Sequence, residues 1–202
     1  MGVAVEEVVA AVRSGRLIVL PTDTVYGLAA TPYREEPVRR LFRVKRRPET
    51  APVALVATSV DFLLQCVPEL RGRDAMIARA LLPGPYTLVL RNSGQRFRWL
   101  TGEAPDAIGV RVPDVDGDAA AVLERVGALA MTSANLHGGP DPRKLEDVEE
   151  SIRAACGALV DGGELPGTAS TVIDFTGFEP RVIREGAIPS AEAIDRVFAA
   201  LR

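Results

Sequence analysis

Polar side chains gather at three points of the sequence where short apolar segments begin or end. The stretch 21–28 (PTDTVYGL) follows the apolar run 17–20, and the stretch 132–135 (TSAN) follows a second apolar run. Ser170 and Thr171 stand where a third begins. In an open α/β sheet, ligands bind in the crevice beyond the strand ends. These hydroxyl, amide and phenol groups are therefore candidates for a substrate site, although the stretch 21–28 taken alone could equally be a polar turn.

Cationic side chains accompany these polar stretches. Lys45 and Arg47 lie just before Pro48, and Arg111 stands between two valines of a short strand pattern. Arg184 directly follows another such pattern. Only two of the 24 basic residues are lysines, which draws attention to Lys45. Hydroxyls and converging cations, without a nucleophile beside a base, suit the binding of an anionic substrate and the stabilisation of charge during group transfer.

Each of these features also has a simpler explanation. The basic run 43–47 could be the solvated end of a helix, as most such runs are. Arg111 could form an ion pair with one of the 27 acidic residues. Ser133 and Asn135 could serve only to cap and turn the chain. The residues by themselves leave these alternatives open.

Familiar catalytic motifs are absent from the sequence. It has no GxxxxGK[ST] loop, and no GxGxxG loop follows a strand pattern. It has no GxSxG elbow and no HExxH helix, and His137 is its single histidine, which excludes any site that needs two. Cys66 and Cys156 lie in apolar surroundings with no histidine or second cysteine nearby. This pattern disfavours a zinc site and a disulfide framework, and it favours a reducing, cytoplasmic location.

The composition is typical of a globular chain with a sizeable core, with 47% hydrophobic and 25% charged residues. The net charge of −3 disfavours a protein that holds nucleic acid mainly through its phosphates. Any RNA contact must then be local or shared with a partner. The first 16 residues resemble neither a signal peptide nor a membrane span.

Hydrophobic periodicity predicts a single domain with a mixed α/β sheet. Strands are expected at 17–20, 52–57, 86–90, 108–112, 128–131, 158–160, 171–175 and 181–183. Helices are expected at 5–12, 38–42, 61–64, 74–82 and 118–126, from 141 onward, and from 190 onward. Asp141 and Pro142 are typical of a helix start. Ser190 is expected to cap the last helix, with Phe198 among its inward residues.

The chain resembles the YrdC/TsaC family of threonylcarbamoyl-AMP synthases. Seven stretches carry the resemblance in the family's order: 21–28, 45–48, 83–88, 109–113, 132–135, 170–174 and 183–186. No one of them is specific, but together they span nearly the whole chain. The resemblance implies one YrdC-like domain over residues 1–202, of α/β (α+β) class. Its twisted mixed sheet would carry helices on its faces and a concave substrate cleft.

The resemblance also implies a reaction. L-threonine, bicarbonate (or CO2) and ATP would give threonylcarbamoyl-AMP and pyrophosphate, for the threonylcarbamoyladenosine modification of ANN-decoding tRNAs. A separate tRNA threonylcarbamoyl transferase complex would take over the product. Mg²⁺ would arrive with ATP and take most of its ligands from phosphates and water, with no dedicated protein site.

Site roles follow from the resemblance position by position. The threonine side would be lined by Thr22, Thr24, Tyr26, Arg111 and Ser170. Lys45 and Arg47 would grip the phosphates as the catalytic residues, so that their replacement by alanine weakens ATP binding and leaves the fold intact. The nucleotide side would be completed by Thr87, Ser133, Asn135 and Arg184.

Two positions depart from the family's pattern, and the function has alternatives. Val56 stands where some members carry a histidine, so threonine would be held differently here. His137 stands where serine is usual, and we predict that it is not a general base. The chief alternative is a non-catalytic YrdC-like paralogue that binds nucleotide or RNA. A carbamoyl-transfer relative acting on other substrates is a third hypothesis.

Overall fold

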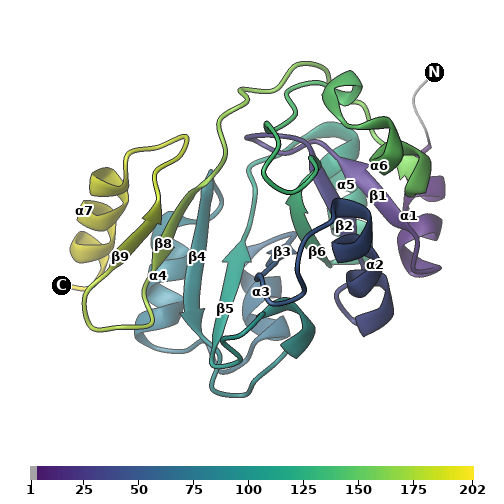
Figure 1. Cartoon of the computed structure of the whole chain (residues 1–202). Helices are drawn as coiled ribbons and strands as arrows, with labels where there is room; N and C mark the ends of the chain where they lie inside the picture. Colours follow the sequence, from purple (N-terminus) through teal and green to yellow (C-terminus); the bar gives the residue numbers. More distant parts are fainter. Residues whose placement is uncertain (1–3) are drawn as a thin grey trace.

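The apolar run 17–20 forms strand β1 (Leu17–Leu20), whose continuous hydrophobic sequence reflects burial on both faces of a sheet. The computed structural model describes residues 4–202, shown in Figure 1. The sheet has nine strands in the order β7-β1-β2-β6-β3-β5-β4-β8-β9. The other strands are β2 (Gly27–Ala30), β3 (Ala54–Ala57), β4 (Tyr86–Arg91), β5 (Ala107–Arg111), β6 (Ala128–Ser133), β7 (Cys156–Leu159), β8 (Thr171–Asp174) and β9 (Arg181–Arg184).

The sheet is mixed, as the sequence predicts. The pairs β1–β7, β3–β5 and β4–β8 are parallel, and the remaining neighbours are antiparallel. The helices are α1 (Val5–Arg13), α2 (Glu35–Lys45), α3 (Val60–Cys66), α4 (Arg73–Leu81), α5 (Gly117–Val126), α6 (Glu150–Ala155) and α7 (Ser190–Ala200). In Figure 1, α7 lies beside β9 at one end of the sheet, and α1, α2 and α6 lie toward the other.

The two faces of the sheet are covered to different extents. One face carries a core built with α2, α3, α4, α6 and α7. On the opposite face, α1 and α5 pack over β1, β2, β6 and β7. Strand β4 shows the consequence, because Tyr86, Leu88 and Leu90 are buried while Thr87 and Val89 are only half-buried. The uncovered part of this second face is where a cleft can form.

Strand β2 was not predicted from the sequence. Residues 27–30 (GLAA) are small and lack the β-branched and aromatic residues that favour strands. Pairing decides their conformation instead, because β2 lies between β1 and β6 and is antiparallel to both. The stretch 21–28 thus forms the turn of a β1–β2 hairpin, and its last residues are already in the sheet.

The helix expected from Asp141 begins only at Glu150, after a 3-10 turn at Leu145–Asp147 (η2). The backbone carbonyls near the expected start are engaged elsewhere. The carbonyl of Pro142 accepts the Tyr26 N–H at 3.1 Å, and that of Arg143 accepts the Leu165 N–H at 2.8 Å. These bonds to neighbouring loops replace the bonds that a helix would make.

The last helix also differs in detail from the prediction. Pro189, not Ser190, is the N-cap residue of α7, and Ser190 is the first helical residue. The Ser190 N–H and hydroxyl both donate to the carboxylate of Glu185. Phe198 is 50% exposed, and Ala193 and Val197 are the buried apolar positions. Within residues 4–202, no helix combines the length and hydropathy needed to cross a membrane.

Candidate active site

The uncovered part of the second sheet face holds a cavity of about 440 Å³. Its floor is formed by alternate residues of the strands, including Ala54 and Val56 of β3, Gly109 of β5 and Val172 of β8. Seven of the expected site residues line it: Thr22, Arg47, Thr87, Arg111, Ser133, Ser170 and Arg184. The fold therefore brings together residues from sequence stretches that are far apart.

Arg111 is the most buried of the arginines in this cavity, with 8% of its surface exposed. Its Nη2 donates to the Asp23 carboxylate and, at 2.8 Å, to the Thr24 hydroxyl. The Nε of Arg111 is buried and has no hydrogen-bond partner within the described residues. The ion-pair explanation is thus confirmed, and the Nε is a donor that no described residue uses.

The Arg184 guanidinium is close enough to Arg47 and Arg111 to affect the pKa of both. Burial lowers the pKa of Arg47 and of Arg111, and the Arg184 guanidinium lowers both further. Asp23 opposes this effect at Arg111. The Nε of Arg47 is, like that of Arg111, buried without a partner among residues 4–202. A cavity with several repelling cations and unused donors is suited to an anion.

A hydroxyl cluster lies beside Arg184. The hydroxyls of Thr87 and Ser170 are hydrogen-bonded to each other at 2.8 Å. Arg184 donates through Nη2 to the Ser170 carbonyl at 2.8 Å and to its hydroxyl at 3.3 Å. The resemblance implied that Thr87 binds the nucleotide and Ser170 binds threonine, whereas the two side chains are direct neighbours in the structure.

Lys45 does not line the cavity, although the fold places it close to the cavity wall. It is 2% exposed, and its Nζ donates to the carbonyls of Ser133 (2.7 Å) and Asn135 (2.6 Å) and to Asn135 Oδ1 (2.6 Å). Burial lowers its pKa to about 8, with repulsion from Arg47 adding to the shift. The solvated-helix explanation is therefore wrong for Lys45, because an ammonium has three protons and all three are donated.

Lys45 holds the loop 132–139 in place through its bonds to Ser133 and Asn135. The Ser133 hydroxyl donates to Asn135 Oδ1 at 2.7 Å, and Asn135 Nδ2 donates to the carbonyl of Gly139. The His137 N–H donates to the Lys45 carbonyl at 3.0 Å, and its side chain is exposed. Helix α2 ends in a left-handed Arg46 (φ +52°), so the chain changes direction between Lys45 and Arg47.

Two residues expected on the threonine side lie behind the cavity wall. Thr24 is fully buried and accepts the hydrogen bond from Arg111. Tyr26 is also fully buried, and its hydroxyl contacts the loop 161–163, donating to the Gly163 carbonyl at 2.8 Å. Burial raises the pKa of Tyr26 to about 12, so its hydroxyl stays protonated at neutral pH. Neither side chain reaches the cavity in this arrangement.

Arg181 and Asp174 line the cavity but were missed from the sequence. The Asp174 carboxylate accepts hydrogen bonds from Arg181 Nη2 at 2.9 Å and from the Thr176 hydroxyl at 2.6 Å. The signal for Asp174 was present in the alternation of β8, because Ser170, Val172 and Asp174 follow one another in steps of two and share a face. Arg181 had no such signal, because it stands three positions from Arg184 and is placed by its pairing with Asp174 across a register irregularity.

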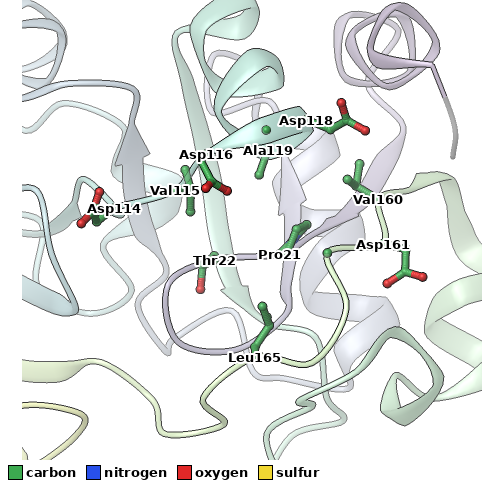
Figure 2. Close-up of a pocket in the computed structure, with 12 residues that line it drawn as sticks. Pro21, Thr22, Asp114, Val115, Asp116, Asp118, Ala119, Val160, Asp161 and Leu165 are labelled. Atoms are coloured by element: carbon green, nitrogen blue, oxygen red, sulfur yellow. The ribbon is translucent and has the colours of Figure 1, made fainter.

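A second cavity of about 500 Å³ lies across the turn that follows β1, and Thr22 lines both cavities. Figure 2 shows the carboxylates that line it, those of Asp114, Asp116, Asp118 and Asp161. Such a lining repels phosphates and carboxylates. The arginine-lined cavity is therefore the candidate site for an anionic substrate.

A known protein family matches most of the chain. The Sua5–YciO–YrdC family model, described as telomere recombination, matches residues 10–186. The chain belongs to the Sua5–YciO–YrdC family. Its sequence is 35% identical to the threonylcarbamoyl-AMP synthase of Pyrococcus abyssi over 192 residues, which is 95% of this chain and 56% of that protein. The chain thus spans little more than half of that relative.

Other relatives are covered over different shares of their length. A putative threonylcarbamoyl-AMP synthase of Mycobacterium tuberculosis is 33% identical over 193 residues, covering 94% of this chain and 86% of that protein. Among solved structures, P. abyssi Sua5 complexed with L-threonine superposes with a TM-score of 0.86 and 34% identity, covering 98% of this chain and 58% of that chain. Escherichia coli YciO superposes with a TM-score of 0.82 and 26% identity, covering 94% and 92%.

Proposed function

We propose that this member of the Sua5–YciO–YrdC family is a threonylcarbamoyl-AMP synthase. The observation that carries the proposal is the arginine-lined cavity with two buried, unpartnered guanidinium nitrogens, on Arg47 and Arg111. Both proposed substrates, ATP and L-threonine, are anions or carry a carboxylate. The names of the P. abyssi and M. tuberculosis relatives, and the L-threonine bound to P. abyssi Sua5, support the same assignment.

The proposed chemistry needs no protein nucleophile. The threonine amine adds to CO2 from bicarbonate and loses a proton, which gives a carbamate. A carbamate oxygen attacks the α-phosphorus of ATP, and the bond to the departing pyrophosphate breaks. In such a transfer, positioning and charge neutralisation provide most of the catalysis.

Each cavity residue then has a proposed role. Arg111 binds the threonine carboxylate, and Arg47 and Arg184 bind the phosphates as forked donors. The hydroxyls of Thr87 and Ser170 lie between these two regions and contact either substrate. Thr22 closes the threonine end.

Lys45 takes a different role from the one that the resemblance implies. Its three protons are donated to Ser133 and Asn135, so we propose that it acts first by holding this loop against the nucleotide. A direct phosphate contact would require Lys45 to exchange one of these bonds.

Mg²⁺ is proposed to enter with ATP and to neutralise phosphate charge. The carboxylates near the cleft are engaged, Asp23 by Arg111 and Asp174 by Arg181. Within residues 4–202, no group of three acidic, histidine or cysteine side chains is arranged to hold a metal. This donor set fits an ion that takes its ligands from phosphates and water.

We further propose a cytoplasmic setting, where ATP is available and where the free thiols of Cys66 and Cys156 stay reduced. The product would pass to a tRNA threonylcarbamoyl transferase complex. A weak, local RNA contact would suffice for any direct role with tRNA.

Modest selectivity for threonine over serine is the first expected result. Val56 is the cross-strand neighbour of Arg111 and lines the same cavity, so it is placed to contact the substrate methyl group. One methyl group in an apolar pocket discriminates by about 1–3 kcal/mol. Competition between the two amino acids at equal concentration should give mainly the threonine product, and Val56→Ala should reduce the preference. Equal use of both by the wild-type protein would contradict this pocket.

Filling the cavity floor should block the nucleotide. A Cβ at Gly109 would lie 3.8 Å from Thr87 Cγ2 and 3.9 Å from the Ala54 Cα, which are ordinary contacts. Gly109→Ala should therefore bind a non-hydrolysable ATP analogue as the wild type does. Gly109→Leu projects into the cavity and should weaken binding by about tenfold or more, equivalent to about 1.4 kcal/mol, with little change in melting temperature. Equal affinity of both variants would place the nucleotide elsewhere.

Pyrophosphate release tests the proposed function as a whole. The protein is incubated with ATP and bicarbonate, with and without L-threonine, and pyrophosphate is measured. We expect release only when threonine is present. Release that is indifferent to threonine would remove the synthase proposal, and binding of ATP without any release would favour the non-catalytic paralogue.

A further inference from the structure

Asp23 is the acidic partner of Arg111. It does not line the cavity, whereas Arg111 does. One of its oxygens accepts a hydrogen bond from Arg111 Nη2, and the other accepts the backbone N–H of Asp114 at 3.2 Å. Its side chain is only 11% exposed. A single carboxylate thus ties the guanidinium to the backbone of the loop that follows β5.

This contact determines which donors Arg111 has left. The two Nη2 protons go to Asp23 and to the Thr24 hydroxyl, and both partners lie in the turn between β1 and β2. The buried Nε has no partner in the described part of the chain. A guanidinium is planar, so holding Nη2 at two points also fixes where the remaining N–H groups point.

We propose that Asp23 is a positioning residue that orients Arg111 for the carboxylate of the amino-acid substrate. This inference depends on the proposed function, because it assumes that an amino acid binds at Arg111. Asp23 acts through Arg111 in two ways. It fixes the plane of the guanidinium, and its charge offsets the repulsion of Arg184.

The surroundings of Arg111 support the second effect, the offset of the repulsion from Arg184. Desolvation and the charge of Arg184 lower the pKa of Arg111, and the Asp23 carboxylate raises it. Without Asp23, the buried cation would be stabilised only by neutral groups, and it would rotate toward any available acceptor. The alternative is that Asp23 only anchors the turn 21–26 to the loop 112–116, with no influence on the substrate.

The substitution Asp23→Asn separates these alternatives, because asparagine has nearly the same shape and lacks the charge. Binding of L-threonine, L-threonine amide and a non-hydrolysable ATP analogue is measured by calorimetry. The amide lacks the carboxylate that Arg111 would recognise. We expect the affinity for L-threonine to fall about tenfold, within the range of coupling between groups in one ion-pair network. Affinities for the amide and for the ATP analogue should change little.

Two further variants provide the controls. Asp116→Asn removes a nearby exposed acid that makes no contact with Arg111, and it should bind L-threonine as the wild type does. Asp23→Glu restores the carboxylate and should recover part of the affinity. In an Arg111→Gln background, Asp23→Asn should produce no additional loss, because its effect passes through Arg111.

Three results would overturn the inference. Unchanged L-threonine affinity in Asp23→Asn, an equal loss for L-threonine and its amide, or additive losses in the double variant would each leave Asp23 with an anchoring role only. The proposed function fails in a different way, through a wild-type protein that binds no L-threonine at all.

Discussion

Replacing Arg111 with glutamine should lower threonine-dependent pyrophosphate release at low threonine concentration by about a hundredfold, because removing one partner of a buried, hydrogen-bonded charge pair costs about 2–5 kcal/mol. Arg111 lines the cavity, and its buried Nε is free of any partner within residues 4–202. Without the guanidinium, the substrate carboxylate would enter a buried site unpaired. Initial rates measured against threonine concentration should show this loss, with ATP-analogue affinity nearly unchanged.

The control for this experiment is an arginine in an exposed ion pair. Arg125 contacts Glu6 on the surface at 2.6 Å, far from the cleft in the sequence and absent from its lining. Arg125→Gln should leave both the rate and the melting temperature unchanged, since such pairs contribute little. Arg111→Lys keeps the positive charge but loses the paired, planar N–H donors of the guanidinium, so it should give an intermediate rate. A threonine KM close to wild type in Arg111→Gln would remove Arg111 from the substrate site.

Replacing Lys45 with methionine should destabilise the fold as well as weaken ATP binding. Three oxygens of Ser133 and Asn135 would lose their buried donor. Asn135 Oδ1 would still accept from the Ser133 hydroxyl, so two carbonyls would be left unpaired at about 1–3 kcal/mol each. A loss of about 3 kcal/mol, within that range, corresponds to a melting temperature about 6–12 °C lower for a chain of this size. Thermal unfolding followed by circular dichroism measures the shift.

The only other lysine in the sequence provides a matched control. Lys144 is exposed and contacts Glu164 at 3.3 Å, so Lys144→Met should unfold at nearly the wild-type temperature. If Lys45→Met also melts with the wild type and loses only ATP binding, the loop-holding role is wrong. The phosphate-gripping role that the resemblance implies would then stand.

The strands with strong apolar patterns were predictable, and those decided by tertiary pairing were not. β1 and β4 carry continuous or alternating hydrophobic residues, and their expected positions match the structure. β2 consists mostly of small residues, and it forms a strand because it pairs with β1 and β6 on its two sides. The helix expected at Asp141 failed for a related reason, since carbonyls at 142 and 143 bond to other loops. Such pairings have no local signature in the sequence.

The candidate site shows the same division. The polar motifs identified which stretches contribute, and seven of the named residues line one cavity. Sequence could not tell which side chain of a motif faces the cavity. Within the stretch 21–28, Thr22 lines the cavity, while Tyr26 is sealed against the loop 161–163 and Asp23 pairs with Arg111. The burial of Lys45 could not be predicted either, because a basic run at a helix end has the same sequence pattern whether its side chains are buried or solvated.

The most direct test of the central claim is the mass of the nucleotide product formed with ¹³C-labelled bicarbonate. The wild-type protein is mixed with ATP, L-threonine and labelled bicarbonate, and the adenylate is analysed at once by mass spectrometry. The proposed chemistry predicts threonylcarbamoyl-AMP that is heavier by the single labelled carbon, in an amount that matches the pyrophosphate released. An adenylate without the label, or AMP and pyrophosphate formed equally well in the absence of threonine, would contradict the account.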